Sequence, residues 1–168
     1  MTLARLGERL RFGWRTASLL AVALALAVAL VLVLLEVRAL SADEEDRDAA
    51  LAAARSQARA FTTIDYREVD DSLDRVLAGA TGEFAEQFEE SRDDIAIGAR
   101  QNQSVSRGDI VSAGVVSLTD DRAQVIVVVD GEVSNISTEE PQPRFYRLQL
   151  ELVRESDRWL TSQLEFVG

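Results

Sequence analysis

The sequence predicts an α+β domain that follows a membrane-spanning helix. An uncharged apolar run fills residues 16–35, helical spacing of apolar residues occupies about 43–100, and a two-residue alternation dominates about 108–167. Helices that precede strands in this way are typical of an α+β fold, in which the helices cover one face of an antiparallel sheet. We therefore expect a basic tail at 1–15, a transmembrane helix at 16–35 and one further domain at 36–168.

The composition excludes most side-chain chemistry. The 168 residues include no His and no Cys, and all 18 cationic residues are Arg. The chain therefore has no imidazole base, no thiolate nucleophile, no Schiff-base or P-loop lysine, and no Cys or His ligand for zinc. A Mg²⁺ or Ca²⁺ site made of carboxylates alone stays formally open. We predict that the protein is not an enzyme and that it holds no cofactor and no metal.

The charges are unevenly distributed along the chain. All but one of the 29 acidic residues follow the apolar run, whereas residues 1–15 are basic. The cations of this tail are Arg5, Arg9, Arg11 and Arg15. Positive charge before an apolar run places the N-terminus in the cytoplasm and the following domain outside the membrane. A domain this acidic repels nucleic acid, so we expect no nucleic-acid partner.

The apolar run Thr16–Leu35 predicts a single-pass membrane anchor. Its 20 residues carry no charge, and a helix of that length spans roughly 30 Å, the hydrocarbon thickness of a bilayer. A cleaved signal peptide is the alternative, but the run exceeds the usual signal core, and Glu36 and Arg38 interrupt the approach to the weak cleavage candidate at 39–41. We therefore expect a retained anchor in contact with the lipid bilayer. The residues expected to form this membrane anchor include Thr16, Leu20, Leu24, Val28, Leu32 and Leu35.

Residues 41–100 predict three helices. The first begins at the capping-box sequence 41–44, and the second is capped at Asp65. The third follows a glycine pair and extends toward Arg100 as one helix. Their apolar faces consist of Leu51, Ala54, Ala58 and Phe61 in the first, Val69, Leu73, Val76 and Leu77 in the second, and Phe84, Phe88 and Ile95 in the third.

The second half of the domain predicts four long strands, at 110–118, 123–133, 144–154 and 158–167. Tight turns are expected at Asp120–Asp121 and at 155–157. Val125–Val129 is apolar on both faces, so we expect this strand to be central or to be covered by a partner. Three helices followed by a curved four-stranded antiparallel sheet is the order of the cone-shaped fold of nuclear transport factor 2 (NTF2).

Several stretches resemble the Mce-associated membrane proteins. After the anchor these are VLAGATGEFAEQF (76–88), AGVVSLTDDRAQVIVVVDGEVSN (113–135) and RLQLELVRESDRWLTSQLEFV (147–167). The resemblance runs in order over most of residues 16–168, although Ser156–Asp157 replaces a turn that more often contains Gly. The matching positions are Leu77, Gly79, Thr81, Gly82 and Phe84 in a helix-corner motif, Asp130 in the second strand, and Arg158 and Trp159 in the last strand.

The resemblance implies an NTF2-like domain outside the membrane and a role without catalysis. Such a protein would dock on an Mce-type importer of lipids or sterols in the bacterial cell envelope and would stabilise or assist it. Importer subunits are then the expected partners, and a lipid is left open as a ligand. Two alternatives remain: a cone that itself relays a lipid, and a scaffold similar to the inner-membrane component of type IV secretion systems.

Three candidate sites have structural interpretations as well as functional ones. The GATG sequence at 79–82 could cradle a phosphate, but no cation adjoins it, and Gly79 and Thr81 suit the C-cap and N-cap of a corner between two helices. Asp65 and Tyr66 could serve as a base and an oxyanion donor, yet an N-cap carboxylate is routinely structural. Trp159 could contact a ligand or partner, but a Trp in a strand is more often part of the core.

Overall fold

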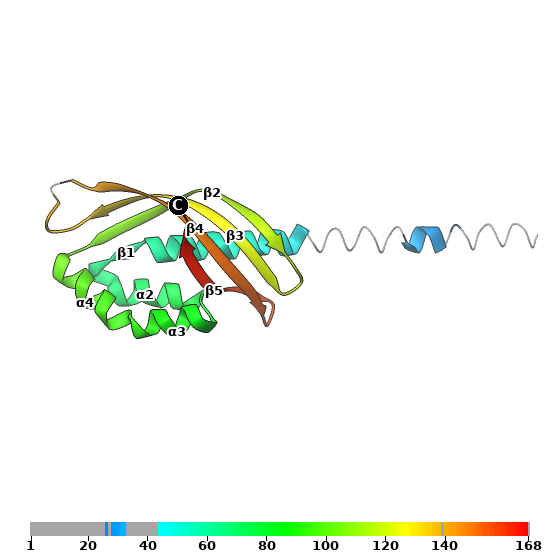
Figure 1. Ribbon diagram of the computed structural model, residues 1–168, viewed down its shortest axis with the longest axis horizontal. Coiled ribbons are helices and arrows are strands. Elements are labelled where there is room, and N and C mark those ends of the chain that lie inside the picture. Colours follow the sequence, from blue (N-terminus) through cyan, green and yellow to red (C-terminus); the bar gives the residue numbers. More distant parts are fainter. Residues whose placement is uncertain (1–25, 27, 33–43, 139, 168) are drawn as a thin grey trace, which may run out of the picture. The chain divides into compact units, whose positions relative to one another are not determined.

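The computed structural model describes residues 26, 28–32, 44–138 and 140–167 of a chain that divides into two compact units, Met1–Glu44 and Glu45–Gly168 (Figure 1). In the first unit, residues 26 and 28–32 are helical, and Val28 and Leu32 of the predicted anchor are exposed. The remaining anchor positions and the four N-terminal arginines lie outside the described residues. These are Thr16, Leu20, Leu24 and Leu35 of the anchor, and Arg5, Arg9, Arg11 and Arg15.

Within the part of the chain that the structure describes, no helix is both long enough and apolar enough to cross a membrane. Most of the predicted transmembrane segment, residues 16–35, falls outside that part. The membrane anchor therefore stays a prediction.

The described residues 44–62 form a helix, here called the long helix, which belongs to the second unit from Glu45 onward. A short 3-10 turn, η1 (Tyr66–Glu68), then leads into the second α-helix, so that helix begins later than Asp65. The predicted third helix is wrong as a single helix, because two helices occupy its place. The α-helices after the long helix are α2 (Val69–Ala78), α3 (Gly82–Glu90) and α4 (Arg92–Asn102).

The break between α3 and α4 lies at Ser91. Its hydroxyl donates to the Gln87 carbonyl over 2.9 Å, and a serine that bonds the helix backbone in this way bends a helix. The two helices then bury Phe88 from α3 and Ala96 and Ala99 from α4 in the same apolar cluster. Apolar spacing alone could not show the break, because Phe88 and Ile95 also suit one continuous helix.

The strands form one antiparallel sheet in chain order. We predicted four strands, but among the described residues the sheet has five, because Ile64 and Asp65 pair with Ser106 and Val105 at its edge. Two residues are too few for the alternation that marks a strand in a sequence. The strands are β1 (Ile64–Asp65), β2 (Val105–Leu118), β3 (Arg122–Ser134), β4 (Gln142–Glu155) and β5 (Arg158–Phe166).

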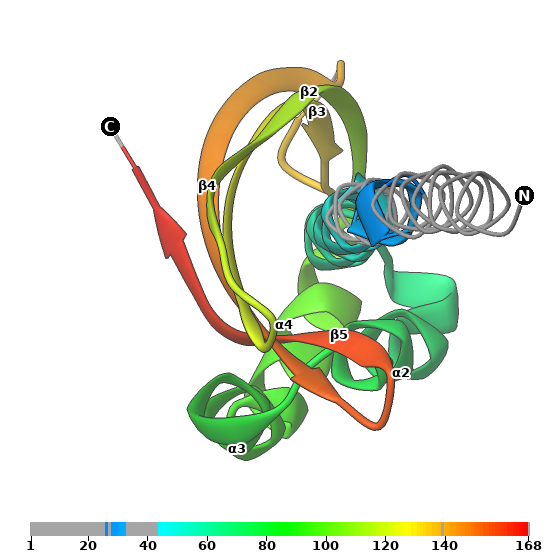
Figure 2. The ribbon, with the colours of Figure 1, turned by 90° about the vertical axis from the view of Figure 1, so that its right-hand side faces the viewer.

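The sheet is strongly curved. Two register shifts between β2 and β3 leave Val111 and Val116 without opposite residues, and such bulges bend and twist a strand. Figure 2 shows the sheet arching over the long helix, with α2, α3 and α4 gathered below. β3 lies between β2 and β4, which confirms the prediction that the doubly apolar segment Val125–Val129 is central.

Two apolar clusters fill the second unit. One lies between the long helix and the sheet, where small side chains allow a close approach of helix and strands. Its centre consists of Ala50, Ala54 and Ala58 of the helix with Val125, Val127, Val129, Leu148, Leu150 and Leu152 of β3 and β4. The other cluster packs α2, α3 and α4 together. The α+β class and the placement of helices on the inner face of the sheet therefore agree with the expectation from sequence.

Ion pairs at the surface reinforce this packing. The Arg154 guanidinium donates to both carboxylate oxygens of Asp46, at 2.7 and 2.8 Å, and so joins β4 to the start of the long helix. Arg92 of α4 pairs with Asp74 of α2 at 2.6 Å. The hydrogen bond to the Asp74 carboxylate raises the pKa of Arg92, which therefore keeps its charge.

Candidate functional site

The glycine pair Gly79 and Gly82 forms a corner between α2 and α3. Gly79 is the C-cap of α2, as predicted. The three consecutive N–H groups of residues 79–81 donate over 3.2, 3.1 and 2.9 Å to the carbonyls of Val76, Leu77 and Thr161, respectively. A phosphate cradle needs free, convergent N–H groups, and those of residues 79–81 already have partners. The geometry therefore favours the corner interpretation over an anion site.

The corner is bound to β5 through the main chain. The Thr161 N–H donates to the Gly79 carbonyl over 2.8 Å, and the Thr161 carbonyl accepts the Thr81 N–H. These two bonds form a short parallel bridge centred on Ala80. The outward main-chain groups of Thr161, on the edge strand, are thus already paired by a segment of this chain.

Side chains strengthen the same junction. The Arg158 guanidinium donates to the Ala78 carbonyl over 3.0 Å, at the C-terminal end of α2, where the helix dipole favours a cation. Thr81 occupies the N-cap position of α3, but its hydroxyl donates to the Glu155 carboxylate over 2.8 Å instead of capping the helix. The predicted N-cap position of Thr81 is therefore confirmed, and its hydroxyl joins the corner to the β4–β5 hairpin.

Most positions of the family resemblance gather around this corner. Leu77 and Phe84 pack in the cluster under α2, and Trp159 is 7% exposed in the core, with the Arg154 guanidinium 5.8 Å from its ring centroid. Asp130 is the exception, because it lies exposed on β3 and opposite Asp109 of β2. The motif positions near the corner therefore build the junction of helices and sheet.

Asp65 and Tyr66 are both engaged by Arg67. Asp65 accepts the Arg67 N–H over 2.9 Å and pairs with its guanidinium at 3.2 Å. The same guanidinium lies 4.7 Å from the centroid of the Tyr66 ring. Asp65 is thus the N-cap of η1, in line with the structural interpretation of this pair.

The buried layers of the described residues contain no titratable side chain. Their buried polar side chains are Gln57, Thr62, Ser72 and Thr161. The Thr161 hydroxyl has no hydrogen-bond partner among the described residues. Across the same residues, no three acidic side chains lie close enough to form a metal site. Acid–base catalysis typically depends on titratable groups whose pKa is shifted by burial or by neighbours, and this interior supplies none.

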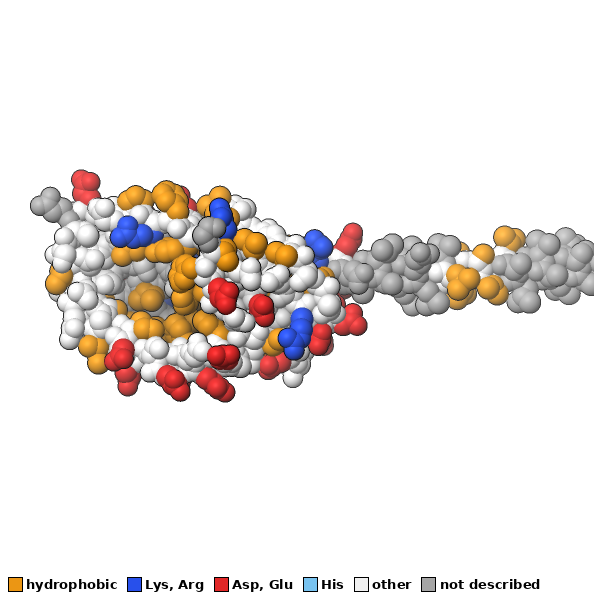
Figure 3. Space-filling view, viewed as in Figure 1, with side chains coloured by type: hydrophobic (Ala, Val, Ile, Leu, Met, Phe, Trp, Pro, Cys, Tyr) orange, Lys and Arg blue, Asp and Glu red, His pale blue; other side chains and the backbone are white. Residues whose placement is uncertain are grey.

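An aromatic cluster connects the long helix, α3 and the last strands. The Phe61 ring centroid lies 6.2, 6.4 and 6.0 Å from those of Phe84, Phe88 and Phe166, and Tyr146 lies 5.8 Å from Phe166. Phe88 is 8% exposed but Phe166 is 61% exposed, so the cluster reaches the surface. Figure 3 shows a hollow on one face of the molecule with hydrophobic side chains in it. Phe166 was not among the residues predicted from the sequence to form a site, although it alternates with Leu164 as a core-facing residue would.

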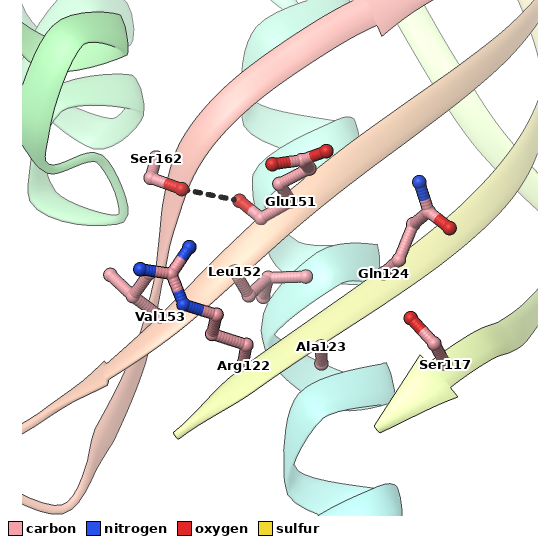
Figure 4. Close-up of a pocket in the computed structure, with 8 residues that line it drawn as sticks. All are labelled: Ser117, Arg122, Ala123, Gln124, Glu151, Leu152, Val153 and Ser162. Carbon is pink, nitrogen blue, oxygen red and sulfur yellow. Dashed lines mark hydrogen bonds between the residues drawn. The ribbon is translucent and has the colours of Figure 1, made fainter. Parts of the chain in front are cut away.

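Two open grooves adjoin β5. One, of about 330 Å³, lies between β5 and α3, where Phe84 and Leu164 alternate with acidic and amide side chains. The other, of about 190 Å³, lies on the β3–β5 sheet (Figure 4), where the Ser162 hydroxyl donates to the Glu151 carbonyl over 3.2 Å. Charged side chains line both grooves, so neither is the enclosed, uncharged pocket expected of a lipid relay.

These features define an α+β domain in which a curved antiparallel sheet encloses a helix and the buried part of the described residues has no titratable group. The chain belongs to the family described as "Uncharacterized protein Rv1363c/MT1408-like", whose sequence pattern matches residues 14–168. The match covers the predicted anchor and the whole domain. It establishes the family and leaves an association with Mce importers as a prediction.

One relative is uncharacterized protein Rv1363c of Mycobacterium tuberculosis (strain ATCC 25618 / H37Rv). It is 27% identical to this chain over 106 residues, which is 63% of this chain and 41% of the relative. The matched part of this chain therefore spans less than half the length of that protein.

Solved structures show the same fold at low sequence identity. An IcmL-like type IV secretion system protein from Legionella pneumophila has a TM-score of 0.60 and 14% identity, with 73% of this chain and 92% of that chain covered. The periplasmic domain of DotI has a TM-score of 0.57 and 17% identity, with 72% and 94% covered. A ketosteroid isomerase-like protein from Erwinia carotovora atroseptica has a TM-score of 0.51 and 18% identity, with 74% and 98% covered. These likenesses support an NTF2-like fold, which enzymes and non-enzymes share.

Proposed function

We propose that this chain is a non-enzymatic accessory protein of the bacterial cell envelope that acts by binding partner proteins. The observation that carries the proposal is the interior of the domain, where the described residues bury aliphatic and aromatic side chains and no titratable group. Such an interior supports a rigid fold but no acid–base chemistry. The surface, with its exposed strands and grooves, is then the part that functions.

The proposed location is the cell membrane, with the N-terminus in the cytoplasm and residues 36–168 outside. The basic tail and the uncharged run at 16–35 support it. A membrane anchor confines the domain beside its partner and so raises its effective concentration there. Modest contacts at the surface of the domain are then sufficient for stable docking.

We propose an Mce-type lipid or sterol importer as the partner machine. The support is the sequence resemblance, whose positions Gly79, Thr81 and Arg158 form the junction of the corner with β5. A scaffold of a secretion machine is the second candidate, favoured by the fold likeness to the IcmL-like protein and the DotI domain. A lipid relay is favoured only by the aromatic cluster that ends at the exposed Phe166.

Affinity purification of the full-length protein from mild-detergent membranes tests this proposal. Mass spectrometry would identify the proteins and lipids that remain bound after washing. A tagged protein that carries only residues 1–44 is the matched control, because it separates partners of the anchor from partners of the domain. Mce subunits, permease or ATPase bound only by the full chain are the expected result.

The other outcomes separate the candidates. Secretion-channel subunits in place of Mce proteins would select the second candidate. Extractable lipid without any specific protein would favour the relay and contradict docking. An eluate identical to that of the 1–44 control would contradict the proposed function altogether.

A further inference from the structure

The C-terminal half of β5 presents unpaired main-chain groups. Residues of an antiparallel strand alternate between bonding the neighbouring strand and directing their N–H and C=O groups away from it. The Val167 N–H donates to the Arg147 carbonyl over 2.9 Å, so Val167 faces β4. Leu164 and Phe166, opposite Leu150 and Leu148, therefore direct their main-chain groups away from β4.

Nearer the start of β5, Thr161 also directs its main-chain groups away from β4. At Thr161 the outward N–H and C=O groups already pair with the corner at Gly79–Thr81. A register shift follows at Ser162, and beyond it no main-chain partner for Leu164 or Phe166 occurs among the described residues. On this edge the outward groups of Thr161 are thus paired within this chain, and among the described residues those of Leu164 and Phe166, in its C-terminal half, are free.

A groove runs beside the free half. It lies between β5 and α3, and Figure 2 shows the C-terminal end of β5 extending away from α3, which lies below it. Phe84 and Leu164 provide apolar surface, while Glu83 and Glu165 provide negative charge. Among the described residues, neither glutamate has a cationic partner; each accepts a hydrogen bond from a glutamine amide, over 2.8 and 2.7 Å, respectively.

We propose that the free half of β5 docks an extended segment of a partner protein, which adds a strand beside Leu164 and Phe166. The added strand alternates apolar residues, which face Phe84 and Leu164, with Arg or Lys residues, which face the glutamates. Main-chain hydrogen bonds provide affinity in this mode of recognition, and alternate side chains provide specificity. Charge complementarity with the acidic groove selects a basic segment, and the existing bridge at Thr161 shows that main-chain groups on this edge accept main-chain partners. The inference rests on the proposed function and specifies its docking site.

The first test uses a labelled peptide, acetyl-Arg-Val-Arg-Val-Arg-Val-amide, with the full-length protein in detergent micelles. Fluorescence anisotropy measures its affinity, and a second peptide with alternate amides N-methylated measures the share due to main-chain hydrogen bonds. We expect N-methylation to weaken binding by about tenfold or more, the loss of one or two hydrogen bonds. Equal binding of both peptides, or no binding of the first, would overturn the proposal.

Variants separate the groove from general attraction to an acidic protein. Glu83→Arg with Glu165→Arg reverses the charge of the groove, and Asp120→Arg with Glu140→Arg makes the same change in net charge at exposed positions elsewhere. We expect about tenfold weaker peptide binding for the groove pair and little change for the control pair. Circular dichroism confirms that both variants fold. Equal losses in the two variants would contradict docking at this groove.

Amide exchange measured by NMR reports the added strand directly. The Leu164 and Phe166 amides should exchange quickly in the free protein and slow on addition of the peptide, whereas Glu165 and Val167 should already be slow. Protection that appears elsewhere would assign the peptide to another surface. A dimer that dissociates on peptide addition would assign the edge to a second copy of this chain instead.

The groove pair also separates this inference from the proposed function. If the partner of the full-length protein co-purifies with the wild type and is lost from the groove variant, both proposals stand. If it is retained by the groove variant, the docking site is wrong and the function stands. If the wild type retains no partner, the proposed function fails regardless of the peptide result.

Discussion

At the scale of single residues, the turn between β4 and β5 carries local backbone strain. Ser156 and Asp157 have φ values of 48° and 66°, the left-handed region that glycine and asparagine adopt most easily. Two such residues in succession form the turn that suits an antiparallel hairpin. Glu155 beside them accepts the Thr81 hydroxyl, so this turn also positions the junction with the corner.

Replacement of Asp157 by Gly should stabilise the protein. A residue with a side chain at this φ costs about 1 kcal/mol relative to glycine, and the lost Arg154–Asp157 pair contributes little because Asp157 is almost fully exposed. We expect an increase of about 1 kcal/mol in the free energy of unfolding, measured by denaturant titration. Asp120→Gly is the control, since Asp120 also lies in a hairpin turn but has no positive φ; an equal gain there would contradict this explanation.

At the scale of elements, Gln57 joins the long helix to the end of α2. It is 3% exposed, and its side-chain amide donates to the Val76 carbonyl over 3.1 Å. Gly79 lies so close to this amide that a β-carbon at residue 79 would collide with it. A β-carbon at residue 79 would therefore displace the Gln57 amide, which bonds the Val76 carbonyl, whereas the φ of −106° at Gly79 suits any residue.

Gly79→Ala should destabilise the protein through this collision. We expect a loss of about 1–3 kcal/mol, as for other overpacked sites, and Gly98→Ala is the matched control because a β-carbon there meets no atom within 4 Å. That control should be neutral or stabilising by up to about 1 kcal/mol. Thermal unfolding of both variants provides the comparison.

A double variant tests the mechanism. Gln57→Ala removes the amide that collides with the new β-carbon, so Gln57→Ala with Gly79→Ala should cost less than the sum of the single changes. Strict additivity would show that the requirement for glycine at residue 79 has another cause.

At the scale of the whole molecule, the N-terminal tail is basic and the domain that follows the apolar run is acidic. The net charge is −11, yet the first 15 residues are basic. The described residues of the domain place many acidic groups at the surface, and the groove beside β5 has two of them. A basic tail before an apolar segment and an acidic domain after it are the features on which the proposed membrane orientation depends.

Fusion reporters test that orientation. Alkaline phosphatase fused after Gly168 should be active, because this enzyme requires an extracytoplasmic location to form its disulfides. Replacement of Arg5, Arg9, Arg11 and Arg15 by Gln should lower that activity by weakening the topology signal, at equal protein levels on immunoblots. An inactive fusion in the unaltered protein would contradict the proposed location.

The predicted strands at 123–133, 144–154 and 158–167 lie within two residues of the bounds of β3, β4 and β5. Their alternation was readable because one face of each strand meets the core. Less of the candidate site, the junction of the corner with β5, could be predicted from the sequence. The corner was anticipated from its glycines, but its attachment to β5 joins residues about 80 positions apart, such as Arg158 and Ala78.

Local pattern was sufficient to place the helices before the four long strands, for the hairpin turns and for the central position of β3, because each follows from periodicity or turn chemistry within a short window. Contacts between distant segments decided the rest. They created β1 by pairing it with β2, engaged the Thr81 hydroxyl with Glu155, and left Leu164 and Phe166 unpaired at an edge. No local pattern specifies which neighbour a strand edge or a hydroxyl meets, since that depends on how the sheet curves around the long helix.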